Sequence, residues 1–498
     1  MRGWNFTLSI DQRASVPIFT QIAHAIADDI RRGRLRPGDV MPGTRTLART
    51  LGVHRNTVIA AYAELSAEGW ITTESGRGTF VSATLPDPRP RRFAAIAAPT
   101  SSADAFELRP GVDVTLCRPD MDHLYNLTGW PDPRLVPTKA LARAWRRAID
   151  RRGRQVLSYG DNAGHPRLRA ALAGMLSATR GLVVDESRVL VTRGTQGALA
   201  AIAHGLLRPG DVVAVENPGY RRAWQMMSLT GACLVPVPVD AHGLSTDHLA
   251  AAAEQHRIRA VVVTPHHQFP TTVTLSAARR LRLLELAREH RFAIIEDDFD
   301  HEFHYEGRPI LPLASADTAG SVIYVGSLSK TLAPGLRLGY VAASPRVIAH
   351  LTKYSTLLDT HGDHVLESAV AELFEDGEVQ RHVRRVQRIY RARRDAMAEL
   401  LRTELGDAVG VTVPAGGTAF WVRVAAGIDV KRWCRACFDQ HVIVESGERF
   451  SFDRQPLPYV RVGYASHREP ELAEAVRRLG AALTTARSPM PAPLAALA

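Results

Sequence analysis

The sequence predicts an α/β protein in which a small amino-terminal unit precedes a large body built on a mostly parallel sheet with helices on both faces. Three observations carry this expectation. The chain has 498 residues, which is too long for a single hydrophobic core. In its middle, near-continuous apolar runs end in polar or glycine-rich turns, as the buried strands of parallel sheets do. The first eighty residues instead show short helical patterns followed by alternation.

Short helices joined by a glycine turn are predicted near the amino terminus. They are expected over residues 21–32, 45–51 and 53–68. Thr44 is a suitable N-cap for the second helix, and Gly52 ends it. The apolar residues expected in the core are Val53, Val58, Tyr62 and Leu65. Two short helices in this arrangement predict a helix-turn-helix, whose second helix enters the major groove of DNA.

Residues 70–81 follow with alternation, a glycine-flanked Arg77 and further alternation, which predicts a two-stranded wing. The motifs Pro-Gly-Asp, Arg-Asn-Thr-Val and Glu-Gly-Trp-Ile come before or at the start of this segment. The order of these motifs and the wing along the chain resembles a GntR-type winged helix. The resemblance gives a DNA-binding domain at residues 1–82. The resemblance implies a double-stranded DNA partner, with contacts from Thr44, Arg45, Arg55, Asn56, Thr57, Arg77 and Gly78. Arg45 and Arg55 could also be an ordinary solvated helix face.

Residues 83–122 have the proline-, alanine- and serine-rich composition of a linker. The body is expected at residues 123–487, with a smaller C-terminal α+β subdomain from about residue 365. The last residues, 488–498, are rich in proline and alanine and predict a disordered tail.

Three apolar runs of the body deliver chemically useful residues at their carboxyl ends, where parallel sheets bind ligands. The run at 189–192 leads into Gly194 and a helix start, and amides at such a helix end bind phosphate. The run at 211–216 leads to Tyr220, an aromatic ring for stacking. The run at 292–296 ends in carboxylates including Asp297, which can hold a pyridine nitrogen protonated.

Lys330 completes this set. It is one of only four lysines and follows an apolar run and Ser327, with Arg337 seven residues later. An amine beside hydroxyls and a guanidinium suits an aldehyde cofactor that carries a phosphate. An isolated Ser-x-x-Lys is more often a solvated loop lysine, so the neighbouring motifs decide the interpretation.

From about residue 123 to 485, these motifs resemble a fold-type I aminotransferase, and the whole chain is most similar to the MocR regulators. The resemblance implies pyridoxal 5′-phosphate (PLP), held by a Schiff base to Lys330, with Asp297 on the pyridine nitrogen and Tyr220 stacked on the ring. It places Thr195, Gln196, Ser327 and Arg337 around the phosphate. It gives His267 or Gln268 the contact to the ring hydroxyl. Phe299 stands where the family more often has tyrosine, which removes a phenol from this contact.

The motif around Arg461 matches the arginine that grips a substrate carboxylate in this family, and Arg222 is a second candidate. Cys434 and Cys437 form a lone Cys-x-x-Cys without further ligands at finger spacing, so we expect two thiols on a helix and no metal site.

Composition agrees with these assignments. The net charge of +11 favours polyanionic partners, although arginine-rich usage could equally reflect genomic composition. No apolar segment resembles a signal peptide or a membrane span, so a cytoplasmic protein without membrane contact is expected.

The combination predicts a PLP-dependent, DNA-binding transcriptional regulator that senses an amino-acid-like compound or PLP itself. We expect a homodimer that reads an operator with paired half-sites. An active aminotransferase that carries a DNA-binding head is the alternative, and a body that binds PLP only as a dimerisation platform is a third possibility. Residual half-transamination is compatible with the first interpretation.

Overall fold

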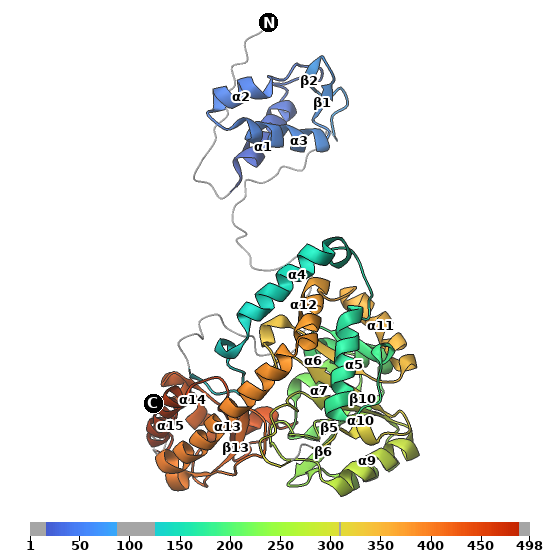
Figure 1. Ribbon diagram of the computed structural model, residues 1–498. Coiled ribbons are helices and arrows are strands. Elements are labelled where there is room, and N and C mark those ends of the chain that lie inside the picture. The colour runs from blue at the N-terminus through green and yellow to red at the C-terminus, as the bar shows by residue number, and fades with distance from the viewer. Residues whose placement is uncertain (1–15, 87–124, 308–309, 488–498) are drawn as a thin grey trace. The chain divides into compact units, whose positions relative to one another are not determined.

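The computed structural model describes residues 16–86, 125–307 and 310–487 (Figure 1). The chain divides into two compact units, residues 1–111 and 112–498. Most of the predicted linker and all of the predicted tail lie outside the described residues, as do the first fifteen residues of the predicted DNA-binding domain.

The described part of the amino-terminal unit holds three helices and an antiparallel hairpin, as the sequence predicts. The elements are α1 (Ile18–Arg31), α2 (Thr44–Leu51), α3 (Arg55–Ala67), β1 (Ile71–Glu74) and β2 (Gly78–Val81). Val58 and Leu65 of α3 are fully buried in one cluster with Ile22 and Ile26 of α1. Burying each such side chain stabilises the unit by about 1.5–3 kcal/mol, which anchors α3.

The helix ends of this unit correct one expectation and explain one residue. Thr44 does not cap α2, because Gly43 holds the N-cap position and Thr44 is the first helical residue. The Thr44 hydroxyl instead accepts a hydrogen bond from Arg55 Nε at 3.4 Å. His54, which has no role in the sequence analysis, caps α3: its Nδ1 accepts from the backbone N–H of Asn56 at 3.2 Å. The cap satisfies one of the free amides at the start of α3.

The body is built on an eight-stranded sheet in the order β4-β11-β10-β9-β8-β5-β6-β7. The strands are β4 (Val189–Thr192), β5 (Val212–Asn217), β6 (Cys233–Asp240), β7 (Gly243–Leu244), β8 (Ile258–Val263), β9 (Ala293–Asp298), β10 (Val322–Ser327) and β11 (Gly339–Ala342). The central strands from β10 to β6 are parallel, whereas β11 is antiparallel to both of its neighbours and β7 to β6. The expected mostly parallel sheet is confirmed.

Helices cover both faces of this sheet (Figure 1). One face packs against α6 (Gly194–Leu206), α7 (Arg221–Ser228) and α11 (Pro345–Asp359), and the other against α8 (Thr246–Gln255), α9 (Ala277–His290) and α10 (Leu313–Ala316). Within β5, Val213 and Val215 join the first cluster and Ala214 joins the second, because successive strand residues point to opposite faces. A third cluster joins α4 (Thr138–Val156), α5 (Pro166–Arg180) and α12 (His364–Glu375) to the β4 edge.

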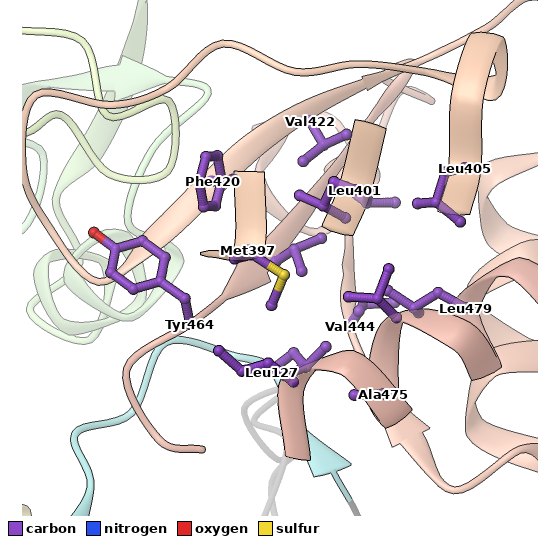
Figure 2. Close-up of a cluster of buried hydrophobic side chains, with 14 of the residues drawn as sticks. Leu127, Met397, Leu401, Leu405, Phe420, Val422, Val444, Tyr464, Ala475 and Leu479 are labelled. Carbon is purple, nitrogen blue, oxygen red and sulfur yellow. The ribbon is translucent and has the colours of Figure 1, made fainter. Parts of the chain in front are cut away.

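The carboxyl-terminal part has its own core around an antiparallel sheet of order β12-β13-β16-β15. Its elements are α13 (Glu378–Leu405), β12 (Val409–Gly410), β13 (Ala419–Val424), α14 (Val430–Asp439), β14 (Val442–Ile443), β15 (Glu445–Ser446), β16 (Tyr459–Gly463) and α15 (Glu469–Arg487). Figure 2 shows how Met397 and Leu401 of α13, Phe420 of β13 and Leu479 of α15 meet in this core. Leu127, near the start of the body, is buried among them.

Leu127 reaches this core because β3 (Tyr125–Asn126) pairs in parallel with β14. The first described residues of the body are therefore part of its carboxyl-terminal subdomain. The loop that follows β3 leads toward the ends of the parallel strands, where the candidate site lies. On α14 of the same subdomain, Cys437 is buried and Cys434 half-buried, as expected for two helix thiols.

Among the described helices, none is long and apolar enough to cross a membrane.

Candidate cofactor and effector site

Lys330 lies three residues beyond the end of β10 and is partly buried. Its Nζ donates a hydrogen bond to the backbone carbonyl of Gly129 at 3.1 Å. Burial lowers the pKa of the Lys330 amine to about 8, and the Arg461 guanidinium lowers it further, against the opposing effect of Asp300 and Glu445. A fraction of this amine is thus uncharged near neutral pH, which a nucleophilic lysine requires.

Three of the four carboxylates at the end of β9 are occupied by structural hydrogen bonds. Glu296 accepts from the backbone N–H groups that start α10, at 2.7 and 2.9 Å. Asp298 accepts from the Tyr324 hydroxyl at 2.7 Å and pairs with His301 Nδ1 at 2.8 Å. Asp300 pairs with His267 Nδ1 at 2.9 Å. These carboxylates therefore support the fold and the positions of neighbouring side chains.

Asp297 is the exception. It is only 3% exposed, and its Oδ1 is buried without a hydrogen-bond partner in the part of the chain that the structure describes. Burial raises the pKa of Asp297 to about 8, and the nearby carboxylates of Asp298, Asp300 and Glu216 add to the shift. A buried acceptor left unpaired is costly, so its presence calls for a partner that is not part of the protein. A protonated ring nitrogen is such a partner.

The amino-terminal end of α6 forms a close-packed corner with Arg337. A Cβ on Gly194, whose φ is +67°, would lie 2.9 Å from a terminal nitrogen of the Arg337 guanidinium. The same guanidinium donates to the Arg193 carbonyl at 2.9 Å. Thr195 and Gln196 occupy the first turn of α6, where free backbone amides bind anions. Ser327 lies at the end of β10, buried, with its hydroxyl accepting from the Ser329 amide at 3.1 Å.

Tyr220 precedes α7 and connects this corner to Asp297. Gln196 Nε2 donates to its hydroxyl at 3.1 Å. Burial raises the pKa of Tyr220 to about 12, the Asp297 carboxylate adds to the shift, and Arg222 and Arg337 oppose it. Arg222 itself is exposed in the first turn of α7. The phenol, the carboxylate and the anion-binding corner therefore act on one another electrostatically.

The residues after β8 include Gln268 and His267, the two candidates for a contact with a ring hydroxyl. The Gln268 amide is consumed within the protein: Nε2 donates to Glu216 Oε2 at 3.1 Å and Oε1 accepts from the Thr271 hydroxyl at 2.6 Å. His267, the other residue expected to contact a ring hydroxyl, contacts Asp300 through Nδ1 at 2.9 Å and His304 Nδ1 through Nε2 at 3.4 Å. Phe299 is half-buried with its ring 6.0 Å from that of Phe269.

Arg461 is buried on β16, with its guanidinium 4.6 Å above the Phe269 ring. It donates to the Thr128 carbonyl and lies 3.6 Å from a Glu445 carboxylate oxygen. Its Nε is buried and unpaired among the described residues. Burial lowers the pKa of Arg461, and Glu445 and Asp300 oppose the shift. A buried guanidinium with unused donor capacity can bind a carboxylate bidentately.

One residue of this site, Thr418, is not indicated by the sequence. Thr418 donates to the Gly129 carbonyl at 3.0 Å, and a Cβ on Gly129 would lie 2.9 Å from an Arg461 nitrogen. Residue 129 can therefore be only glycine at this approach, with φ at +80°. Nothing in the local sequence around Thr418 indicates this contact, because it joins residues 289 positions apart.

Taken together, the open positions fit PLP. The amino-terminal turn of α6 with Arg337 suits the cofactor's phosphate, and Asp297 suits its ring nitrogen. Tyr220 suits the face of its ring, and Lys330 suits its carbonyl carbon. The fit rests on the unpaired Asp297 oxygen and on the amino-terminal turn of α6.

The amino-terminal unit presents a separate candidate surface. Arg45, Arg55 and Asn56 are exposed, and Thr44 and Thr57 are half-buried. In the wing, Gly78 is exposed and Arg77 forms an ion pair with Glu74 at 2.6 Å. The second helix of the pair and the wing thus both carry exposed polar and basic groups.

Comparisons with known proteins agree with both units. Residues 19–81 match the family described as bacterial regulatory proteins, gntR family, and residues 133–479 match aminotransferase class I and II. A probable rhizopine catabolism regulatory protein MocR of Rhizobium meliloti is 31% identical over 494 residues, with 98% of each chain covered. The chain belongs to the MocR-type GntR family of transcriptional regulators.

Other relatives share one or both units of this MocR-type chain. The HTH-type transcriptional regulator TauR of Rhodobacter capsulatus is 33% identical over 472 residues, covering 93% of this chain and 96% of TauR. The structure of LysN, an α-aminoadipate aminotransferase of Thermus thermophilus complexed with N-(5′-phosphopyridoxyl)-L-leucine, superposes with a TM-score of 0.69 and 29% identity. It covers 73% of this chain and 93% of LysN. The expected fold-type I body and GntR-type head are confirmed, and the head is a DNA-binding domain.

Proposed function

We propose that this MocR-type regulator holds PLP on Lys330 and controls DNA binding by sensing a compound that carries both an amine and a carboxylate. One observation carries the proposal: Lys330, with its pKa lowered to about 8, lies within the electrostatic reach of buried Arg461 in a chain that also has a DNA-binding head. The cofactor of this fold is PLP, which supplies an aldehyde carbon to which one amine can bind in place of another.

The proposed holding residues follow from the open positions. Asp297 accepts a hydrogen bond from the protonated ring nitrogen, and Tyr220 stacks on the ring. Thr195, Gln196, Ser327 and Arg337 surround the phosphate. Because Gln268 is fully used by Glu216 and Thr271, we assign it to supporting the loop.

The effector is proposed to replace Lys330. PLP would supply the carbonyl carbon that an amine can bind, and the effector's amine would take the place of Lys330, which would be released as a free amine. Arg461 binds the effector's carboxylate through the donor capacity that the protein leaves open. Arg222, exposed at the start of α7, is assigned a second contact at the rim. PLP itself remains the alternative effector.

On the DNA side, we assign base or phosphate contacts to α2 and α3 and the minor groove to the wing. The residues are Thr44, Arg45, Arg55, Asn56, Thr57, Arg77 and Gly78. A homodimer with two heads suits an operator with paired half-sites. A regulator of promoters acts in the cytoplasm. A ligand shifts DNA binding only through its different affinity for two states of the dimer.

The test uses absorbance and covalent trapping on the full-length protein. A cofactor band in the purified protein should shift on titration with one amino acid, and the same compound should change operator affinity. In the absence of that compound, borohydride reduction should fix the cofactor to Lys330, which peptide mapping can identify readily among only four lysines.

Lys330→Ala should lose both the trapped adduct and the effector response, whereas Lys353→Ala, at an exposed position on α11, should keep both. Retained effector response in Lys330→Ala would refute the sensing proposal. Multiple turnovers with a keto acid at ordinary enzyme rates would favour an aminotransferase instead.

A further inference from the structure

Four histidines gather beside the cofactor site, in two loops that are far apart in sequence. His266 and His267 follow β8, and His301 and His304 follow β9. β8 and β9 are neighbouring parallel strands, so the loops at their carboxyl ends meet. The His266 ring lies 4.3 Å from that of His267 and 4.4 Å from that of His301, and the His267 ring lies 5.7 Å from that of His304.

Three of these rings bring possible ligand atoms close together. The ligand atoms of His266, His267 and His304 all lie within 4.8 Å of one another. His304 Nδ1 and His267 Nε2 share a hydrogen bond at 3.4 Å, which a bound ion would replace. A tetrahedral Zn²⁺ with Zn–N bonds of about 2.0–2.1 Å requires its nitrogens to be roughly 3.3 Å apart. One edge of such a site is already at this spacing, and the others need only a modest approach.

His266 supplies an independent indication of a ligand. It is 5% exposed, and its Nε2 is buried without a hydrogen-bond partner in the described part of the chain. A buried, unpaired ring nitrogen costs stability unless an ion or water satisfies it. The rings of His267, His301 and His304 all lie within 5.5 Å of the His266 ring, so a ligand of Nε2 can be shared with this cluster.

Two carboxylates, those of Asp300 and Asp298, bind the ring nitrogens of His267 and His301 and so fix the orientation of these rings. Asp300 Oδ1 lies 2.9 Å from His267 Nδ1, which directs the proton to Nδ1 and leaves the lone pair on Nε2. His301 is engaged by Asp298 through Nδ1 at 2.8 Å and stacks on His266, so it supports that ring. Space at His267 Nε2 depends on Gly416, because a Cβ there would lie 2.3 Å from this nitrogen.

We propose that His266 Nε2, His267 Nε2 and His304 Nδ1 bind one divalent transition-metal ion of the Zn²⁺ class. Imidazole nitrogens select such ions over Mg²⁺ or Ca²⁺. His304 is half-buried, so a water molecule completes the coordination from its side. The sequence analysis expected no metal, because the ligands come from two loops with 37 residues between His266 and His304 and do not match finger spacing.

The ion would join the β8 and β9 loops at the edge of the cofactor site. Asp300, which holds His267, also acts electrostatically on Lys330 and Arg461. Metal occupancy therefore provides a second input to the same pocket, beyond the proposed sensing of an amine. Metal binding by these histidines does not depend on whether PLP chemistry regulates DNA binding.

The test uses untagged full-length protein, stripped with a chelator and titrated with Co²⁺. We expect one Co²⁺ per chain, the visible absorption of a tetrahedral nitrogen site and displacement by Zn²⁺. His266→Gln and His304→Gln should each weaken Co²⁺ binding at least tenfold. His256→Gln, at an exposed histidine, is the matched control and should bind as the unaltered protein does.

Three results would overturn the proposal. They are the absence of stoichiometric Co²⁺ uptake, uptake that both histidine variants retain, and a thiolate-to-cobalt band that disappears in Cys434→Ser. The last would locate the ion on the α14 thiols. If His266→Gln does not fold, as far-ultraviolet circular dichroism would show, His304→Gln at its half-buried position decides the outcome.

Discussion

At the scale of single residues, Lys330 and Asp297 show how burial changes the pKa of an amine and of a carboxyl. Burial moves the pKa of each to about 8, downward for the amine and upward for the acid. Desolvation disfavours the charged form of both groups. Without cofactor and near neutral pH, the Asp297 carboxyl is therefore largely neutral, whereas only a minority of the Lys330 amine is uncharged. A ligand that pairs with both groups relieves the cost of their burial.

The acid gives a prediction about stability and pH. In the folded, cofactor-free protein, the pKa of Asp297 of about 8 keeps it protonated up to that pH, whereas it ionises near pH 4 in the unfolded chain. Its contribution to stability is complete below pH 4 and is lost as the pH rises to 8. Asp297→Asn should therefore lose less thermal stability between pH 5 and 8, by roughly 2 °C or more in Tm. Calorimetry of both cofactor-free proteins measures this, with Glu254→Gln as an exposed control.

The amine gives a prediction about rate and pH. Only the unprotonated Lys330 amine attacks a carbonyl, so the rate of PLP attachment should rise with pH and level off above about 8. Stopped-flow absorbance at the cofactor band measures the profile. A midpoint near 10 would show that the pocket does not perturb this lysine, and Lys353→Ala should leave the profile unchanged.

These residues also show what the sequence could and could not predict. Lys330, Asp297 and Tyr220 each follow a recognisable buried strand, and parallel strands bring such ends together, so their common location was predictable. The role of Gln268 was not predictable, because its side-chain amide donates a hydrogen bond to the buried Glu216 carboxylate. The histidine cluster and Thr418 depend on contacts between distant loops that no local pattern encodes.

At the scale of elements, the start of α6 is shaped by close backbone approach. Gly194→Ala would place a methyl group 2.9 Å from Arg337 and put alanine at a φ of +67°. Arg337 must then move from the proposed phosphate site. We expect about tenfold weaker PLP binding, since a charge-assisted hydrogen bond contributes about 1.5–3 kcal/mol.

Equilibrium titration with PLP measures this loss. Gly174→Ala is the matched control, because a Cβ at that exposed position of α5 meets nothing within 4 Å. It should bind PLP normally and stabilise the helix slightly. Equal losses in both variants would contradict the assignment of the phosphate to α6.

The α3 cap supports another prediction at this scale. His54→Ala removes the acceptor for the Asn56 amide and should cost about 0.5–2 kcal/mol of local stability. Hydrogen exchange followed by mass spectrometry should show faster exchange in the first turn of α3. His54→Ser should restore protection, because a serine oxygen also caps helices well.

At the scale of the whole molecule, the chain combines a DNA-binding head with an aminotransferase-like body. The head is a compact helical unit with exposed arginines, and the body is a much larger sheet-based unit with the candidate pocket. The order of motifs along the chain was enough to predict both folds. The start of α2 was less predictable, because the Thr44 hydroxyl accepts a hydrogen bond from Arg55 of the next helix and no side chain caps α2.

Binding to DNA should depend on salt through individual arginines. Arg55→Ala should weaken operator binding and, if Arg55 contacts a phosphate, lower the slope of log affinity against log salt by about 1 per half-site. Arg282→Ala, on α9 of the body, should change neither quantity. Fluorescence anisotropy at several salt concentrations measures both. An unchanged affinity in Arg55→Ala would assign this residue to a solvated helix face.

The Gly129 carbonyl accepts hydrogen bonds from both Lys330 and Thr418, and Thr418 directly precedes β13 of the carboxyl-terminal subdomain. One peptide group therefore joins the candidate cofactor lysine to that subdomain. In the proposed exchange of Lys330 for an effector, this peptide group would be the first part of the backbone to change its hydrogen bonding.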